Sequence, residues 1–121
     1  MIKIAKCVYD KPDSSDGTRV LVMRMWPRGI SKDKVDVWLK DLGTERELIR
    51  KWKSGRVSWE EYENEYLKSL KGKEETLLKL AAESEKGAIS LLCTERDPSH
   101  CHRSLLKSAI EQLRTANDDG T

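Results

Sequence analysis

The feature that most constrains the fold is a run of hydrophobic side chains that predicts a strand over residues 19–26. Because successive side chains of a strand point to opposite faces of its sheet, this run is apolar on both faces, although Arg24 interrupts it. Strands of this kind are typical of parallel sheets that are covered on both sides. Pro27 ends the run, since it lacks the backbone N–H that a continuing ladder needs. The hydrophobic residues of the run are Val20, Leu21, Val22, Met23 and Met25.

Two further segments predict strands. Residues 2–9 alternate in the manner of a short terminal strand. The apolar run over residues 89–92 predicts a buried strand, which a turn at Asp97-Pro98 follows. A helical spacing of apolar residues comes next, so this part of the chain is interpreted as strand, loop and helix. The apolar positions of that last helix are Leu105, Leu106, Ile110 and Leu113.

Helical periodicity and capping signals occupy the middle of the chain. Ser31 is the expected N-cap of an amphipathic helix that Gly43 ends. Capping-box spacing at residues 44–47 and again at residues 58–61 predicts two more helices, and a fourth is expected to end at Gly87. The apolar stripe of the first helix consists of Val35, Trp38, Leu39 and Leu42, and Trp52 and Trp59 fall in the stripes of the next two, so these three tryptophans are interpreted as core.

Three strands among four or five helices predict a small α/β protein. Its sheet is expected to be mostly parallel, with about three or four strands covered by helices in a Rossmann-like layering. A length of 121 residues fits a single domain, which we place at residues 1–114. Residues 115–121 have little to bury beyond Ala116 and are expected to form a frayed tail.

The charge balance gives no sign of a strongly charged partner. The chain has 23 Lys and Arg against 21 Asp and Glu, and a net charge of +2 does not by itself favour nucleic acid or an anionic membrane. No apolar run approaches the roughly 20 residues of a spanning helix. Residues 1–7 are too charged for a signal peptide, so we expect a cytoplasmic protein with reduced thiols and no membrane partner.

Side chains that can carry out chemistry gather between the last strand and the last helix. The loop over residues 93–103 contains both histidines and two of the three cysteines. Because the carboxyl ends of parallel strands meet at one edge, this loop should lie near the segment Trp26-Pro27-Arg28-Gly29. The two segments predict a crevice for a ligand. The candidates in the loop are Cys93, Glu95, Arg96, His100, Cys101, His102 and Arg103.

These residue types predict an anionic ligand, such as a nucleotide or a phosphorylated metabolite. Arginine side chains would hold the anion, and Trp26 would stack on a ring. Cys101 is expected in the first turn of the last helix, where free N–H groups and the helix dipole lower the pKa of a thiol. The ligand-binding candidates are therefore Arg24, Trp26, Arg28, Glu95, Arg96 and Arg103, and the catalytic candidates are Cys101 and His102.

Each of these residues also has a purely structural interpretation. Arg24 lies on an apolar strand face and needs a partner, so an ion pair with Glu95 that only ties the sheet together is the alternative to anion binding. Free cysteines are commonly small buried hydrophobes, which we favour for Cys93, whereas Cys101 stays open. The alternative function is then a non-enzymatic interaction or nucleic-acid-binding module with passive cysteines.

Spacing disfavours two familiar kinds of cysteine site. A phosphatase-like site needs an Arg at the sixth position after a strand-end Cys, but Ser99 stands there after Cys93 and Lys107 stands there after Cys101. Adjacent residues on a helix point about 100° apart, which strains a tetrahedral centre shared by Cys101 and His102. No metal is therefore predicted, and the cofactor is left undetermined.

Specific segments spread along the chain carry a resemblance to a known family. They are Val8-Tyr9-Asp10, Ser15-Asp16-Gly17, Arg24-Met25-Trp26-Pro27-Arg28-Gly29-Ile30, Trp38-Leu39-Lys40, Leu91-Leu92-Cys93 and Cys101-His102-Arg103. In these segments the sequence resembles domain-of-unknown-function family 488, in its small YeaO-like branch. The resemblance covers nearly the whole chain and implies an α/β fold and the location of a site, but it supplies no reaction.

Overall fold

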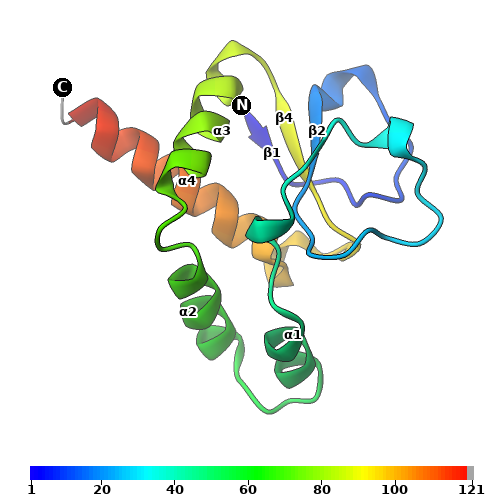
Figure 1. The fold of residues 1–121 in the computed structure, drawn as a ribbon, viewed down its shortest axis with the longest axis vertical. Helices are drawn as coiled ribbons and strands as arrows, with labels where there is room; N and C mark the ends of the chain where they lie inside the picture. Colours follow the sequence, from blue (N-terminus) through cyan, green and yellow to red (C-terminus); the bar gives the residue numbers. More distant parts are fainter. Residues whose placement is uncertain (120–121) are drawn as a thin grey trace.

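The computed structural model describes residues 1–119, which fold around one parallel sheet (Figure 1). The strand order is β1-β4-β2-β3, and every pair of neighbours is parallel, which confirms the expected small α/β protein. The strands are β1 (Ile2–Lys3), β2 (Thr18–Leu21), β3 (Val37–Trp38) and β4 (Ile89–Leu92). The helices are α1 (Arg46–Lys53), α2 (Trp59–Ser69), α3 (Glu74–Lys86) and α4 (His102–Asp119), with short 3-10 helices at Ser14–Asp16, Lys32–Lys34, Lys40–Leu42 and Pro98–His100.

The central position of β4 brings the segments of the candidate site together. β4 pairs with β1 on one side and with β2 on the other, and all of its residues are buried. The pairing continues past the strand ends, because Val22 N–H donates to Leu92 O at 3.1 Å and Val8 N–H donates to Cys93 O at 2.8 Å. The backbone segments that follow these strands therefore meet at the carboxyl edge of the sheet.

Strands β1 and β2 are shorter than the sequence predicts. The chain after β1 forms a turn in which Cys7 N–H donates to the Asp10 carboxylate at 2.9 Å. The chain after β2 lies against Gly43, where an added Cβ would come within 2.5 Å of the Arg24 nitrogen. This close approach leaves no room for a side chain at position 43. The predicted boundaries are therefore wrong at the C-terminal end of both strands.

The amphipathic helix predicted between residues 31 and 43 is wrong, because this segment contains the edge strand β3 between two 3-10 helices. Asp36 explains the difference. Its carboxylate accepts the Arg19 N–H at 2.7 Å, and its own N–H donates to Arg19 O at 2.9 Å. The backbone thus pairs with β2 rather than with itself, and Trp38 lies in a strand with 40% of its surface exposed instead of in the core.

One of the two predicted capping boxes is present. In α2, Ser58 Oγ accepts the Glu61 N–H at 3.1 Å and the Glu61 carboxylate accepts the Ser58 N–H at 3.3 Å. The box predicted for α1 is wrong, since that helix has Glu45 as its N-cap without a side-chain cap. Thr44 instead shares a buried hydrogen bond of 2.6 Å with the Tyr62 hydroxyl, which ties the start of α1 to α2.

Helix α4 passes the predicted end of the domain. It continues through residues 115–119, which the sequence assigns to a frayed tail, and residues 120 and 121 of that tail lie outside the described residues. Within residues 1–119, no helix combines the length and the apolar character that crossing a membrane requires.

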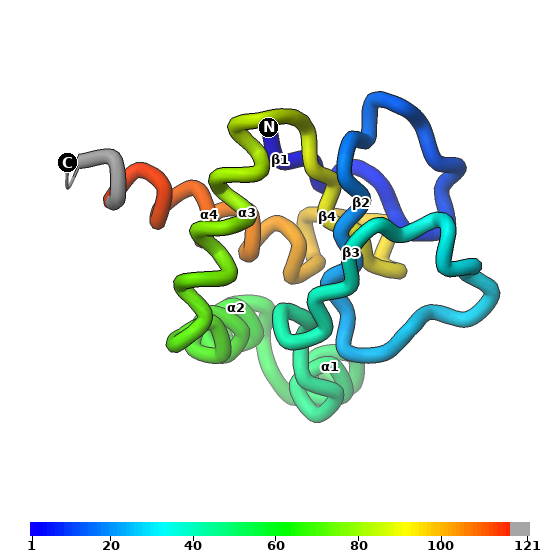
Figure 2. The backbone as a smooth tube through the Cα atoms, turned by 45° about the horizontal axis from the view of Figure 1, so that its top comes forward, coloured from blue at the N-terminus to red at the C-terminus, as the bar shows by residue number. Residues whose placement is uncertain are grey.

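The two faces of the sheet are covered by different kinds of structure. Helices α2, α3 and α4 pack on one face, whereas irregular segments cover the other, on the side opposite α3 and α4 in Figure 2. Both faces are buried, as the sequence predicts, but helices cover only one of them. The helix-covered cluster includes Val20, Leu91, Tyr66, Leu106 and Ile110, and the second cluster consists of Val8, Leu21, Ile30 and Leu92.

Candidate cysteine site

A pocket of about 350 Å³ lies at the carboxyl edge of β2 and β4. Of the two segments that the sequence predicts for the crevice, the loop after β4 contributes to the lining, whereas Trp26-Pro27-Arg28-Gly29 does not. Its place is taken by the residues between β2 and Trp26, and α1 adds a third wall. The residues after β2 contribute Met23, Arg24 and Met25, and the loop after β4 contributes Cys93, Thr94, Glu95, His100, Cys101 and His102. The rest of the lining comes from Thr44, Arg46, Ile49, Trp52, Lys53 and Tyr62.

The loop after β4 brings its own two ends together. Asp97 caps the 3-10 helix Pro98–His100 by accepting a backbone N–H, and this turn reverses the chain. As a result Cys101, which directly precedes α4, returns to Cys93, which directly follows β4. The sulfur atoms of both cysteines and one ring nitrogen of His102 lie within 4.8 Å of one another, and all three residues are buried.

The hydrogen bonds of His102 fix its tautomer. Its Nε2 lies 2.5 Å from Val22 O, and because a carbonyl oxygen can only accept, Nε2 carries the proton. Burial lowers the pKa of His102, so the ring is neutral and Nδ1 keeps a free lone pair. Nδ1 lies 3.7 Å from the Cys101 sulfur. A basic nitrogen therefore faces the sulfur from inside the protein.

Arg103 is completely buried, and its partners are carbonyl oxygens and a sulfur. Nη1 donates to Lys6 O, Nη2 donates to Glu95 O at 2.6 Å, and Nε donates to Cys101 Sγ at 3.3 Å. Among the described side chains, no carboxylate forms an ion pair with Arg103. Because a buried cation is costly without a negative partner, the charge balance favours a thiolate at Cys101.

The two cysteines of the cluster titrate in opposite directions. A hydrogen bond from the Cys93 thiol, together with the backbone N–H and the guanidinium of Arg103, lowers the pKa of Cys101 to about 7. The same hydrogen bond and burial raise the pKa of Cys93 well above its usual value. Of the two cysteines, Cys101 is therefore the one that loses its proton first, and Cys93 is the one that keeps it.

Arg24 lines the pocket but has a different partner from the one expected. Its Nε donates to Gly43 O at 2.9 Å, and Nη2 lies 4.0 Å from the Glu45 carboxylate. The expected pair with Glu95 is wrong, because the Glu95 carboxylate accepts the N–H of Asp97 at 3.1 Å instead. Arg24 is about one third exposed, so its guanidinium is accessible from the pocket.

Four of the predicted ligand-binding residues do not line the pocket. Trp26 donates from Nε1 to Ile30 O at 2.8 Å and packs edge-on against Trp38, while Arg28 is exposed. Arg96 forms an exposed ion pair of 2.8 Å with Asp10. Arg103 lies behind Cys101 and contacts its sulfur. The structure thus brings together Arg24, Glu95, Cys101 and His102, with Cys93 beside them, and leaves Trp26, Arg28 and Arg96 outside.

The wall that α1 contributes was not predicted from the sequence. Arg46, Ile49 and Lys53 line the pocket at positions i, i+3 and i+7 of that helix. This spacing puts them on one helical face, so the signal was present in the sequence. Trp52 also lines the pocket, where its ring stacks on His100 with 6.1 Å between centroids, although the sequence interprets it as core only.

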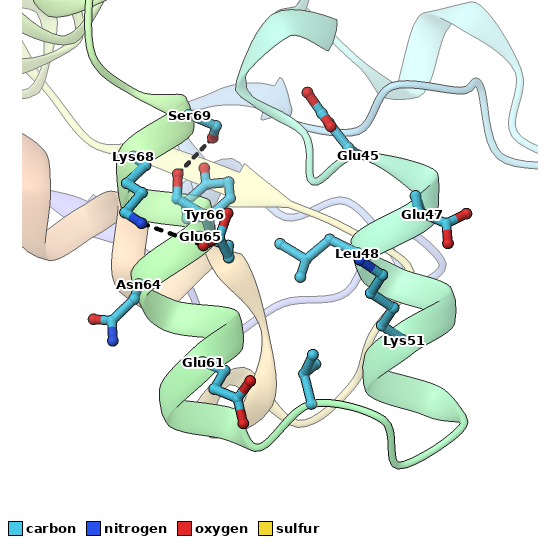
Figure 3. Close-up of a pocket in the computed structure, with 11 residues that line it drawn as sticks. Glu45, Glu47, Leu48, Lys51, Glu61, Asn64, Glu65, Tyr66, Lys68 and Ser69 are labelled. Atoms are coloured by element: carbon cyan, nitrogen blue, oxygen red, sulfur yellow. Dashed lines mark hydrogen bonds and ion pairs between the residues drawn. The ribbon is translucent and has the colours of Figure 1, made fainter.

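A second and larger pocket of about 630 Å³ lies between α1 and α2 (Figure 3). Its lining contains four carboxylates, and the only positive charges in the lining are those of Lys51 and Lys68. Lys68 is already paired with Glu65 at 3.4 Å. This pocket offers no reactive side chain and repels anions, so the cysteine pocket is the better candidate site. The carboxylates are those of Glu45, Glu47, Glu61 and Glu65.

The cysteine cluster is also the place where a metal ion could be held. Zinc takes thiolate and imidazole ligands, and Cys93, Cys101 and His102 supply donor atoms of these kinds. One feature disfavours a cation here, since the Arg103 guanidinium already lies 3.3 Å from the Cys101 sulfur. We interpret the cluster as a thiol, a thiolate and an imidazole, and the absence of a metal stays a prediction.

The fold and the site together define a small parallel α/β protein with a buried cysteine cluster at the carboxyl edge of its sheet. The chain belongs to the DUF488 family, because residues 1–121 match the family model described as the inactive DUF488-N3 subclade. The uncharacterized protein YeaO of Escherichia coli (strain K12) is 32% identical over 110 residues, which are 89% of this chain and 96% of that protein. These matches confirm the resemblance to the YeaO-like branch.

A relative from another bacterial group matches a smaller part of the chain. The uncharacterized protein Rv3073c of Mycobacterium tuberculosis (strain ATCC 25618 / H37Rv) is 47% identical over 53 residues, 42% of this chain and 43% of that protein. No solved structure matches the chain. The comparisons therefore give the family and leave the chemistry to be argued from the site.

Proposed function

We propose that the protein binds a small anionic ligand in the cysteine pocket and carries out cysteine-dependent chemistry on it. The observation that carries this proposal is the contact of 3.3 Å between the buried Arg103 guanidinium and the Cys101 sulfur. That contact favours the thiolate, which is the nucleophilic form of cysteine. Cys101 also lines the pocket, so a ligand there can approach the sulfur.

The charge of the pocket lining supports an anionic ligand. Arg24, Arg46 and Lys53 contribute three cations, against the single carboxylate of Glu95. A volume of about 350 Å³ is at the small end of the range for small-molecule sites. Phosphorylated metabolites and mononucleotides combine the matching charge and size, and Trp52 offers a ring for stacking.

In this proposal the residues divide the chemistry between them. The Cys101 sulfur forms a bond to an electrophilic atom of the ligand, and the leaving group departs with its bonding electrons. Arg24, Arg46 and Lys53 hold the negative groups of the ligand. His102 would accept, at Nδ1, the proton of the water that later releases the ligand, because that nitrogen carries the free lone pair.

The test combines ligand binding with a matched pair of variants. Purified protein is screened by thermal shift against inorganic phosphate, mononucleotides and sugar phosphates. A stabilising compound should lose its effect in Arg24→Ala and keep it in Arg28→Ala, since Arg28 is exposed outside the pocket. Turnover of that compound should then disappear in Cys101→Ser. Equal shifts in both arginine variants would place the ligand elsewhere and contradict the proposal.

One observation favours a second candidate function. The matching subclade is described as inactive, which agrees with a non-enzymatic interaction or nucleic-acid-binding module. Such a module would bind long nucleic acid with an affinity that falls steeply with salt, and mononucleotides would not compete. Ligand binding without turnover, in a protein whose Cys101 still reacts with alkylating reagents, would favour this module over the enzyme.

A further inference from the structure

We propose that Cys101 and Cys93 reduce hydroperoxides, with Cys101 as the sulfur that attacks the peroxide and Cys93 as the thiol that then closes a disulfide. This inference rests on the proposed function, because it requires the same Cys101 thiolate in the same pocket. It adds a substrate class, a hydroperoxide such as hydrogen peroxide, and it assigns Cys93 a role that the sequence did not give it.

The positions of the two sulfur atoms carry the proposal. They lie within 4.8 Å of each other, and both cysteines line the pocket. A disulfide has a sulfur–sulfur distance of about 2.05 Å, so a shift of a few ångströms is needed. The loop between the two cysteines can supply this shift on the Cys101 side, since most of its residues are exposed and the part that directly precedes Cys101 is the short 3-10 helix Pro98–His100.

The first step consumes the peroxide. The Cys101 thiolate attacks one peroxide oxygen, the O–O bond breaks, and the other oxygen leaves as hydroxide and takes a proton from solvent to become water. The sulfur is oxidised to a sulfenic acid, Cys101–SOH, while the peroxide is reduced. Arg103 supports this step because its guanidinium lies 3.3 Å from the sulfur and stabilises the attacking thiolate.

The second step forms the disulfide. The Cys93 sulfur attacks the sulfenic sulfur, the S–O bond breaks, and the leaving oxygen takes the Cys93 proton and departs as water. In the reduced protein the neighbouring Cys101 sulfur and burial raise the pKa of Cys93, so Cys93 keeps its proton. Oxidation removes the negative charge of the Cys101 thiolate. His102 Nδ1, whose lone pair faces Cys101, is then available to carry the proton.

The third cysteine provides an internal control. Cys7 is buried, but its sulfur donates to Thr94 O at 3.4 Å and is not part of the cluster of Cys93, Cys101 and His102. It also lacks a neighbouring guanidinium hydrogen bond among the described residues. The reaction should therefore be confined to Cys93 and Cys101, and a Cys7→Ser variant should behave like the unchanged protein.

The experiment treats fully reduced protein with one equivalent of hydrogen peroxide, blocks the remaining thiols and maps the peptides by mass spectrometry. We expect one disulfide-linked peptide pair that joins Cys93 to Cys101, a loss of two hydrogens from the intact mass and full reversal by dithiothreitol. In Cys93→Ser, dimedone should trap a sulfenic acid at Cys101. A disulfide that includes Cys7, or equal dimedone trapping at Cys101 with and without Cys93, would overturn the proposal.

A parallel alkylation experiment separates this proposal from the proposed function. Cys101 is alkylated with iodoacetate in the same reduced samples, and ligand binding is measured in the Arg24→Ala variant. Rapid alkylation of Cys101 without disulfide formation would reject the peroxide reaction alone. Slow alkylation together with no oxidation would reject both, because Cys101 would not then be a reactive thiolate. Alkylation of Cys101 and disulfide formation are both measured on the protein with its native cysteines, so neither result depends on whether a cysteine variant folds.

Discussion

Arg103 contacts Cys101 in two ways, through its guanidinium Nε at 3.3 Å from the sulfur and through its backbone N–H at the start of α4. The backbone donor is free because the first N–H groups of a helix have no partner within the helix. One buried residue thus supplies both the positive charge and the helix-terminal donor that stabilise a thiolate.

Alkylation of Cys101 should follow its lowered pKa. Because the thiolate is the reacting form, the rate should rise with pH, reach half its maximum near pH 7 and level off above that. The groups that face the sulfur are Cys93, His102, Arg103, Tyr62 and Tyr66, and both tyrosines have raised pKa values, so they stay neutral in this range. The measurement is iodoacetamide incorporation at Cys101 against pH, followed by peptide mapping.

The lowered pKa of Cys101 should also make the stability of the protein depend on pH. The pKa of Cys101 is lower in the folded protein than in an unfolded chain, so its contribution to the free energy of unfolding is complete above the unfolded pKa and is lost as the pH falls through about 7. Substituting Cys101→Ser should remove this part of the pH dependence. An alkylation midpoint near the ordinary thiol value of about 8.5 would contradict both expectations.

Replacing Arg103 should destabilise the protein as well as change Cys101. Arg103→Leu leaves the carbonyl oxygens of Lys6 and Glu95 without their buried donors, which should lower the free energy of unfolding by about 3 kcal/mol or more. Arg103→Lys keeps the charge but not the forked geometry, so it should recover part of the acidity of Cys101 and little of the stability. Urea unfolding measures the first effect and alkylation the second.

Arg28→Leu is the matched control for that experiment. Arg28 is exposed, so this substitution should change the free energy of unfolding by no more than about 0.5 kcal/mol and leave alkylation of Cys101 unchanged. Equal free energies of unfolding for Arg103→Leu and Arg28→Leu would show that the hydrogen bonds of the buried guanidinium do not stabilise the fold.

His102 should be neutral and should carry its proton on Nε2. Burial lowers its pKa, and Val22 O accepts from that nitrogen. Nitrogen NMR of the protein labelled at histidine should show one ring with a protonated Nε2 and an unprotonated Nδ1 from about pH 6.5 upward. A signal from His102 that titrates near the ordinary histidine value would show that the ring is not buried as described.

Reversing the charges on α1 should weaken binding of anions. Arg46→Glu and Lys53→Glu each put a negative group into the lining of the cysteine pocket, so the affinity for a phosphorylated ligand found by thermal shift should fall about tenfold or more. Arg50→Glu is the control, because Arg50 lies on the same helix but does not line this pocket. Isothermal calorimetry compares the three variants, and equal losses in all three would indicate a general effect of net charge.

The local signals in the sequence determined the centre of the fold. The apolar run that contains Val20 and Val22, and the one from Ile89 to Leu92, are hydrophobic on both faces, so they can only be buried strands of a covered sheet. The sequence predicted a mostly parallel sheet, and the structure shows that the two runs pair directly and in parallel, so their carboxyl ends meet at one edge. The same reasoning predicted that the loop after β4 lies at the carboxyl edge of the sheet, where ligands of parallel α/β proteins commonly bind.

Hydrogen bonding between distant segments decided the structure of regions that local periodicity did not predict. Residues 31–43 have helical spacing, yet the hydrogen bonds between Asp36 and Arg19 make the segment an edge strand, and no local pattern encodes a partner that distant. Trp26 donates to Ile30 O and packs against Trp38 of the edge strand, so its position also depends on that strand. The sequence also could not separate arginines in the pocket from Arg103, which is buried behind it.

The sequence and the tertiary structure determined different properties of the cysteine cluster. The sequence determined that Cys93, Cys101 and His102 lie in one loop of a parallel sheet, because the strand before it and the helix after it are both strongly patterned. Only the folded chain decided which sulfur is charged. The charge on Cys101 is favoured by Cys93 and by Arg103, and both lie beside the sulfur because the loop after β4 brings them to the start of α4. Charge in a buried site is set by three-dimensional neighbours, and these are not visible in the spacing of residues.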